Sequence, residues 1–164
     1  AFHWQECDRT DGMARVTVLL KGGGSENVGR QYTLPDEALG AGRDLDGVRK
    51  CVLDAVYQAQ GMGCAPGVVG VAIGGDRAGG CEEAKLQLLR PLGQRNESPQ
   101  LARLEEELLR QANQMGIGPM GLGGKCTVLD VKIGSRSRHP ASYFVTICYN
   151  CWCVRRQSTE LRYA

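Results

Sequence analysis

Three cysteines near the end of the chain, Cys148, Cys151 and Cys153, are close enough in sequence to share one metal site. They end the run RHPASYFVTICYNCWC, which opens with an arginine and His139. Its β-branched and aromatic residues predict a largely buried strand of about ten residues from Ala141. Side chains alternate along a strand, so Cys148 should face away from the other two, which share a face if the strand persists.

Cys64 is a fourth candidate ligand, because it lies in the loop Gly63-Cys64-Ala65-Pro66-Gly67, where neither helix nor strand packing demands a thiol. Together with Cys148, Cys151 and Cys153 it could form a four-thiolate zinc site, which would make the chain a structural module without catalysis. The predicted direction of Cys148 argues against that site. The remaining thiols are expected to serve packing, and Cys153 is left unassigned; the packing group is Cys7, Cys51, Cys81, Cys126 and Cys148.

A glycine-rich segment supplies a second kind of chemistry. Lys21, Gly22, Gly23, Gly24 and Ser25 directly follow an apolar run, residues 14–20. Glycines expose backbone N–H groups and the lysine adds a positive charge, which together suit a carboxylate or phosphate. The alternative is a flexible loop, and the spacing is not that of a Walker loop.

The elements that must position these residues alternate between strand and helix. Strands are predicted at residues 2–5, 14–20, 68–73 and 128–133 besides the one near the end, with Asp11-Gly12 as a hairpin turn between the first two. Helices are predicted from Asp44 or Asp46 to Gly61, from Cys81 to Arg90, and from Ser98-Pro99 to Gly116, with Glu105 to Glu107 mainly on the solvated side. The pattern indicates an α+β or mixed α/β fold, with a mixed sheet and packed helices.

Length and composition limit the number of domains, the possible partners and the cellular compartment. The chain has 164 residues, of which 42% are hydrophobic, which is enough for one compact domain. A net charge of only +2 without a basic run gives no case for nucleic acid, and the apolar runs are too short to span a membrane. Eight cysteines without a secretory signal indicate a reducing compartment. Because no initiator Met opens the chain, we expect its N-terminal part to be missing.

Four segments, KGGGSEN, GCAPGVVGVAIGG, GPMGLGGK and RHPAS followed by Cys151, occur here in an order that resembles the iron–sulfur class I fumarases and L-tartrate dehydratases. The likeness covers nearly all of residues 14–156 and corresponds to the latter part of their α domain or α subunit. It implies that residues 1–164 are a partial α, cluster-binding domain of a hydro-lyase that acts on fumarate or malate, with L-tartrate dehydratase as the alternative.

The resemblance also implies a cofactor. In that family three cysteines hold a 4Fe-4S cluster and leave one iron open to the substrate. Cys64 matches the second ligand, and Cys151 matches the third, twelve residues after the family's histidine, which is His139 here. The family's first ligand lies in a Cys-Gln-Asp-Thr-Gly segment that this sequence lacks, so the chain alone is not expected to complete the cluster.

Roles for the other candidates follow from the same resemblance. The open iron acts as a Lewis acid on the substrate hydroxyl, while backbone groups of Gly22 to Ser25 hold the small dicarboxylate. His139 would contact the substrate carboxylate or the leaving hydroxyl; otherwise it is a turn residue before Pro140. The proton-abstracting base comes from a β domain or β subunit, in a homodimer or α2β2 assembly in the cytoplasm.

Overall fold

The body of the protein is a four-stranded mixed sheet with strand order β2-β5-β3-β4. The computed structural model describes residues 12–153 and 155–162. Within the sheet β3 and β4 run parallel, whereas β5 is antiparallel to both of its neighbours, β2 and β3. The predicted mixed sheet with packed helices is therefore confirmed. The strands are β2 (Arg30–Thr33), β3 (Gly67–Gly74), β4 (Val128–Arg136) and β5 (Phe144–Asn150).

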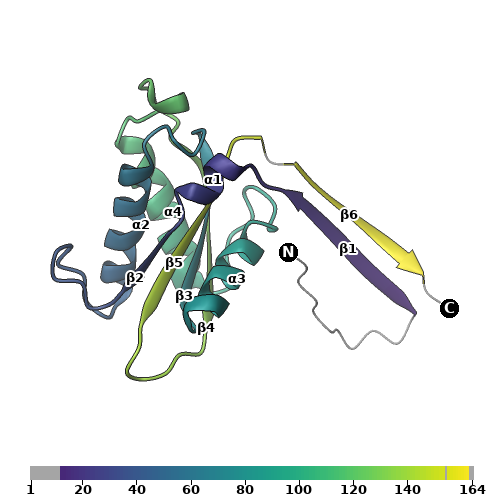
Figure 1. The fold of residues 1–164 in the computed structure, drawn as a ribbon, viewed down its shortest axis with the longest axis horizontal. Helices are drawn as coiled ribbons and strands as arrows, with labels where there is room; N and C mark the ends of the chain where they lie inside the picture. Colours follow the sequence, from purple (N-terminus) through teal and green to yellow (C-terminus); the bar gives the residue numbers. More distant parts are fainter. Residues whose placement is uncertain (1–11, 154, 163–164) are drawn as a thin grey trace.

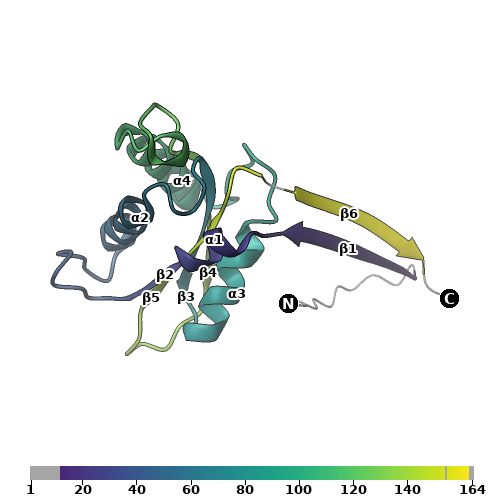
Figure 2. The same ribbon diagram turned by 45° about the horizontal axis from the view of Figure 1, so that its top comes forward.

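Helices cover both faces of this sheet (Figures 1 and 2). The helices α2 (Leu45–Ala59) and α4 (Pro99–Gln114) pack over the larger apolar core, and α3 (Arg77–Gln87) covers the opposite face. Because β3 is enclosed on both sides, all of its residues are buried and its sequence lacks polar alternation. In the part of the chain that the structure describes, no helix is both long and apolar enough to cross a membrane.

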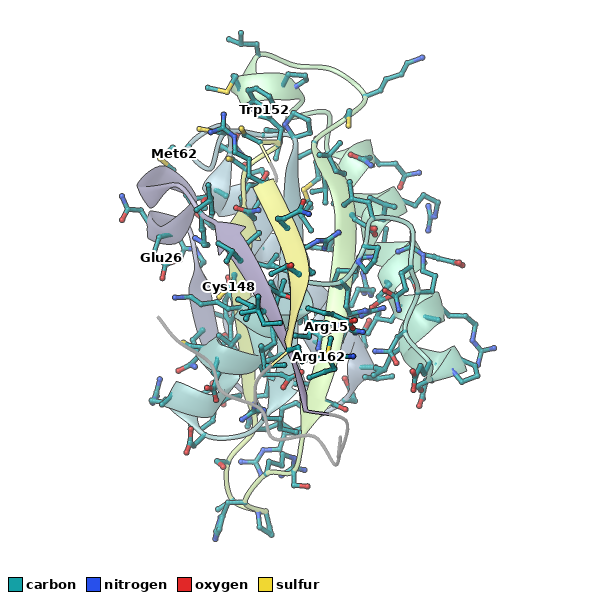
Figure 3. The ribbon with its side chains drawn as sticks, turned by 90° about the vertical axis from the view of Figure 1, so that its right-hand side faces the viewer. Arg15, Glu26, Met62, Cys148, Trp152 and Arg162 are labelled. Carbon is teal, nitrogen blue, oxygen red and sulfur yellow. The ribbon has the colours of Figure 1, made fainter. Side chains whose placement is uncertain are left out.

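A separate two-stranded ribbon projects from the body (Figure 1). It is formed by β1 (Met13–Leu20) and β6 (Arg155–Arg162), which pair antiparallel over their whole length. Figure 3 views the molecule from the ribbon's side, with Arg15 and Arg162 labelled on the two strands. Arg156 fastens the ribbon to the body, since its Nη1 donates to the carbonyls of Leu89 and Arg90, both at 2.6 Å. The strand predicted at residues 2–5 lies outside the described residues.

Most predicted elements are present, with shifted boundaries. The Asp44 carboxylate caps α2 by accepting from the Gly47 N–H at 2.7 Å, and Cys51 is buried in the core as predicted. Helix α3, which was predicted to begin at Cys81, begins at Arg77, because the Asp76 carboxylate caps it by accepting from the Gly79 N–H at 2.6 Å. The sequence pattern did not predict this start, because Gly79 and Gly80 lie in the first turn and glycine is a poor helix former.

The expected solvated position of Glu105 is wrong. Its side chain is fully buried, and Oε1 accepts from Arg90 Nη1 at 2.7 Å and from the Ile133 N–H at 2.8 Å. Its Oε2 accepts from the Asn96 N–H at 2.9 Å. The helical pattern could not show this, because the partners belong to the connection between α3 and α4 and to β4. Glu106 and Glu107 are exposed, as predicted.

Side chains of α4 thereby complete the outer edge of β4. Besides Glu105, Asn113 accepts from the N–H groups of Thr127 and Val128 through Oδ1, at 2.7 and 2.9 Å. Its Nδ2 returns a hydrogen bond to the Val128 carbonyl at 3.1 Å. An edge strand whose backbone groups are paired in this way offers less template for another chain.

We predict that Glu105→Ala lowers the free energy of unfolding by about 3–5 kcal/mol, because it removes the carboxylate partner of Arg90 and leaves the N–H groups of Asn96 and Ile133 without their acceptor. Urea unfolding followed by circular dichroism measures the loss. Glu107→Ala, on the exposed side of the same helix, is the control and should change stability by less than about 0.5 kcal/mol. Equal effects of the two substitutions would contradict the role given to Glu105.

Candidate active site

The Cys64 turn joins α2 to β3 and has an unusual backbone. Cys64 has a φ of +58°, in the left-handed region that non-glycine residues rarely occupy. Its N–H donates to the Gly61 carbonyl at 3.1 Å, and the carbonyl of the next residue, Ala65, accepts from the Met120 N–H at 2.8 Å. The GPMGLGGK segment, residues 118–125, contains the short 3-10 helix η1 (Pro119–Gly121) and therefore holds the Cys64 turn in place.

Tyr149 packs beneath this turn and explains its glycines. A Cβ at Gly63 or Gly67, the residues that frame the turn, would overlap the Tyr149 ring. Burial raises the pKa of Tyr149 to about 12, with smaller contributions from the thiols of Cys64, Cys126 and Cys151. Tyr149 is thus a neutral phenol in the neighbourhood of three thiols, which the sequence patterns did not predict. An aromatic residue late in a strand, beside a Gly-x3-Gly turn, was the available signal.

The structure brings Cys151 to the Cys64 turn. Strand β5 ends at Asn150, so Cys151 and Cys153 follow the strand, and the shared face predicted for them does not apply. The backbone N–H of Trp152 donates to the Cys64 carbonyl at 3.5 Å. The thiols of Cys64 and Cys151 are both free and half-buried. Two cysteines distant in sequence therefore lie on adjoining turns.

The Lys21–Ser25 segment is more ordered than a flexible loop. Residues Gly23–Asn27 form the short helix α1, and buried Ser25 donates its hydroxyl to the Gly22 carbonyl at 2.9 Å. A Cβ at Gly22 or Gly23 would meet only open space, so their backbone is accessible. Lys21 and Gly22 line a pocket of about 290 Å³ together with Cys151 and Cys153. The segment predicted to bind an anion thus meets one of the predicted cluster ligands.

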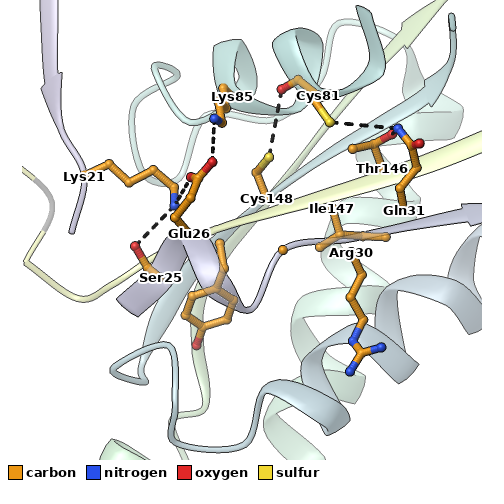
Figure 4. A pocket seen from close by; sticks show the side chains of 12 residues that line it. Lys21, Ser25, Glu26, Arg30, Gln31, Cys81, Lys85, Thr146, Ile147 and Cys148 are labelled. Atoms are coloured by element: carbon orange, nitrogen blue, oxygen red, sulfur yellow. Dashed lines mark hydrogen bonds and ion pairs between the residues drawn. The ribbon is translucent and has the colours of Figure 1, made fainter. Parts of the chain in front are cut away.

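Lys21 is not an isolated cation. Its Nζ pairs with Glu26 at 2.6 Å, and Lys85 of α3 reaches the same carboxylate at 2.7 Å (Figure 4). Hydrogen bonds from Lys21 and then Lys85 lower the pKa of Glu26 to about 2. The two lysines share one carboxylate, so one positive charge remains uncompensated within this group of three.

His139 is placed away from these turns. It is exposed in the connection between β4 and β5, where its Nδ1 accepts from the Ala141 N–H at 3.1 Å. The seven residues of β5 separate it from Cys151, a span of roughly 20 Å at the usual rise per residue. Figure 1 shows this connection at the opposite end of the sheet from α1. Within one chain, the structure does not bring His139 to the cysteine turns.

The four-thiolate alternative does not fit the structure. Cys148 is buried on the α3 face, where its thiol points to the Cys81 carbonyl at 3.9 Å. Over residues 12–153 and 155–162, no three or more His, Cys, Asp or Glu side chains are placed to hold a metal ion together. Cys64 and Cys151 nevertheless suit two of the three thiolate positions of a cluster, because both are accessible thiols on adjoining turns.

Comparison with known proteins shows the family of the chain. A family model described as Fumarate hydratase (Fumerase) matches residues 2–160. A putative class I fumarate hydratase from Geobacillus stearothermophilus is 54% identical over 149 residues, which are 89% of this chain and 29% of that protein. The chain belongs to the class I fumarate hydratase and L-tartrate dehydratase alpha-subunit family.

Two further relatives of this family carry the other name. A putative L(+)-tartrate dehydratase subunit alpha from Methanocaldococcus jannaschii is 42% identical, over 90% of this chain and 50% of the relative. The L(+)-tartrate dehydratase subunit alpha of Escherichia coli K12 is 35% identical, over 87% of this chain and 46% of the relative. The chain thus spans half or less of the length of these relatives.

We predict that Lys85→Met raises the pKa of Glu26 from about 2 toward its ordinary value of 4.5, because one of the two lysines that stabilise the carboxylate is lost. A carboxylate whose pKa is lowered by folding stabilises the fold at pH values above its unfolded pKa. That stability is lost as the pH falls through the folded pKa. Acid destabilisation attributable to Glu26 should therefore begin in the same range in both proteins, near the unfolded pKa of 4.5, but it should be smaller in the variant and complete at a higher pH.

Carboxyl ¹³C NMR titration measures this pKa directly. Lys50→Met is the matched control, since Lys50 pairs with Asp46 on α2 at 3.1 Å and does not contact Glu26. A Glu26 pKa that stays near 2 in Lys85→Met would show that Lys85 does not contribute to the shift.

Proposed function

We propose that this chain is the cluster-binding part of an iron–sulfur hydro-lyase that adds or removes water on a small 2-hydroxy dicarboxylate. The meeting of the Cys64 and Cys151 turns, through the hydrogen bond from Trp152 to the Cys64 carbonyl, is the observation that supports it best. Fumarate and malate are the first-choice substrates. L-Tartrate is the second, favoured by the tartrate dehydratase alpha subunits among the relatives.

The two cysteine turns would hold the cluster, and the glycine-rich segment would bind the substrate. Cys64 and Cys151 supply two thiolates to a 4Fe-4S cluster, and the third comes from a segment outside the described residues. When bound, the cluster would supply a Lewis-acidic iron that polarises the substrate hydroxyl. The accessible N–H groups of Gly22, Gly23 and Gly24 donate to a substrate carboxylate, and Lys21 adds positive charge beside them. Ser25 holds that segment in shape through its bond to Gly22.

A further domain or subunit is needed to complete this site. Apolar side chains are exposed around both cysteine turns: Met62 is 66% exposed, Met120 52% and Trp152 58%. Exposed apolar groups gathered around a site typically mark a surface that another protein part covers. Because relatives are named alpha subunits, we assign this surface to a β domain or β subunit that also brings the base. A cytoplasmic location is proposed with it, where thiols stay reduced.

His139 can serve such a site only from another copy of the chain. About 20 Å of strand separates it from Cys151 in its own chain. We therefore propose a homodimer, or the α pair of an α2β2 assembly, in which His139 of one copy reaches the cysteine turns of the second. There it would contact the substrate carboxylate or the leaving hydroxyl.

The direct test of the proposed function uses the complete protein with its β part, purified without oxygen. We predict broad brown absorbance, iron and sulfide in the sample, and hydration of fumarate or dehydration of L-tartrate. Cys64→Ser and Cys151→Ser should each abolish the absorbance, because a serine hydroxyl does not replace a cluster thiolate. Cys148→Ser is the control and should retain the cluster, since Cys148 lies on the α3 face. A colourless wild-type protein with bound zinc would contradict the proposal.

The role of His139 is tested by complementation. His139→Asn alone should keep the cluster and lower turnover by at least ~10²-fold, the usual scale for a positioned polar catalyst. When His139→Asn and Cys151→Ser chains are assembled together, mixed dimers regain one intact site. Random pairing then restores about a quarter of wild-type activity. No recovery in verified mixed dimers would contradict the contribution from a second copy, and near-normal kinetics in His139→Asn would leave it a turn residue.

A further inference from the structure

Asn150 is a buried amide without a partner. It is the last residue of β5, and its side chain is fully buried. Among the described residues, neither Nδ2 nor Oδ1 of Asn150 finds a hydrogen-bond partner. Buried polar groups in proteins are nearly always paired, so an amide with both ends unpaired calls for a ligand or a water.

Other buried polar side chains show that this fold pairs such groups as a rule. On the same strand and the same face, Thr146 bonds to Gln31 Nε2 at 2.8 Å. The carboxylates of Glu105 and Asp130 each accept several hydrogen bonds. The exception therefore falls on the residue directly before Cys151.

The sheet register places Asn150 between the two cysteine turns. It lies opposite Val68, at the start of β3 and just after the Cys64 turn. Since side chains alternate along β5, the amide shares the face of Cys148, over which the Lys21–Ser25 segment passes. Cys151, the next residue, lines a pocket with Lys21 and Gly22. The unpaired amide is thus adjacent in sequence to Cys151 and paired in register with the first residues that follow the Cys64 turn.

We propose that Asn150 is a positioning residue whose Nδ2–H donates a hydrogen bond to a sulfur of the cluster held by Cys64 and Cys151. This inference rests on the proposed function. Hydrogen bonds to cluster sulfurs raise the reduction potential and help to retain the metal. An amide is suited to this task because it is a donor without charge, whereas a carboxylate would repel thiolate and sulfide. The Oδ1 atom is left to a single water molecule.

The test compares Asn150→Leu with the wild-type holoenzyme, purified without oxygen. Leucine has a similar shape but no donor, so iron release to a chelator should become about 10- to 100-fold faster, the range found for groups that support metal ligands. The midpoint potential of the cluster, measured by redox titration, should fall. The cluster-free form of the same variant should melt at the wild-type temperature or higher, because an unpaired buried amide has been removed.

Two further variants separate the interpretations. Thr146→Val is the matched control: it removes a paired polar group from the same face, so it should lower the melting temperature with and without cluster and leave the potential unchanged. Asn150→Asp, which keeps the shape but replaces the donor with a carboxylate, should lower the potential as Asn150→Leu does.

The possible results distinguish a failure of the proposed function from a failure of the role given to Asn150. A wild-type protein that binds no cluster would overturn the proposed function itself. A wild-type cluster whose potential and iron release are unchanged in Asn150→Leu would overturn only the role of Asn150. A cluster-free Asn150→Leu protein that melts far below wild type, or does not fold, would show that the Nδ2 donor is satisfied by water or by another part of the protein and not by the cluster.

Discussion

The buried carboxylate of Glu105 is the constraint on which the sheet depends. It neutralises Arg90 and accepts the Ile133 N–H, so a side chain of α4 takes the place of a neighbouring strand at the edge of β4. With that edge completed, β3 is enclosed between β4 and β5 and between two layers of helices. The Cys64 turn then starts from the most buried strand of the fold, which allows it to keep its left-handed backbone.

The antiparallel pairing of β3 and β5 decides which residues can share a site. Because the two strands run in opposite directions, the start of β3 lies beside the end of β5, as the pairing of Val68 with Asn150 shows. Cys64 precedes the first of these residues and Cys151 follows the second, so the ladder alone brings them together. The same ladder pairs Ile73 with Val145, which puts His139 at the far end of the sheet.

Local sequence patterns predicted the elements, but not the contacts between distant segments. The core position of Cys51 followed from helical periodicity, and the two glycine-rich segments and Cys64 were recognisable from type and order. The burial of Glu105 was not predictable, because its partners Arg90 and Ile133 come from other elements. Nor was the pairing of β1 with β6, which lie at opposite ends of the described chain. The family resemblance likewise implied that His139 and Cys151 share one site, which their separation along β5 excludes within a single chain.

The projecting ribbon has a mechanical consequence for the site at its root. Strand β1 leads directly into Lys21, and β6 follows the Cys151 segment, with Leu20 paired to Arg155 where the two strands leave the body. The hydrogen bonds between β1 and β6 therefore hold the start of the Lys21–Ser25 segment beside the start of β6. Eight residues of strand give an arm of roughly 25 Å. Because Leu20 is paired with Arg155, a displacement of the ribbon would move the starting point of Lys21 together with that of β6.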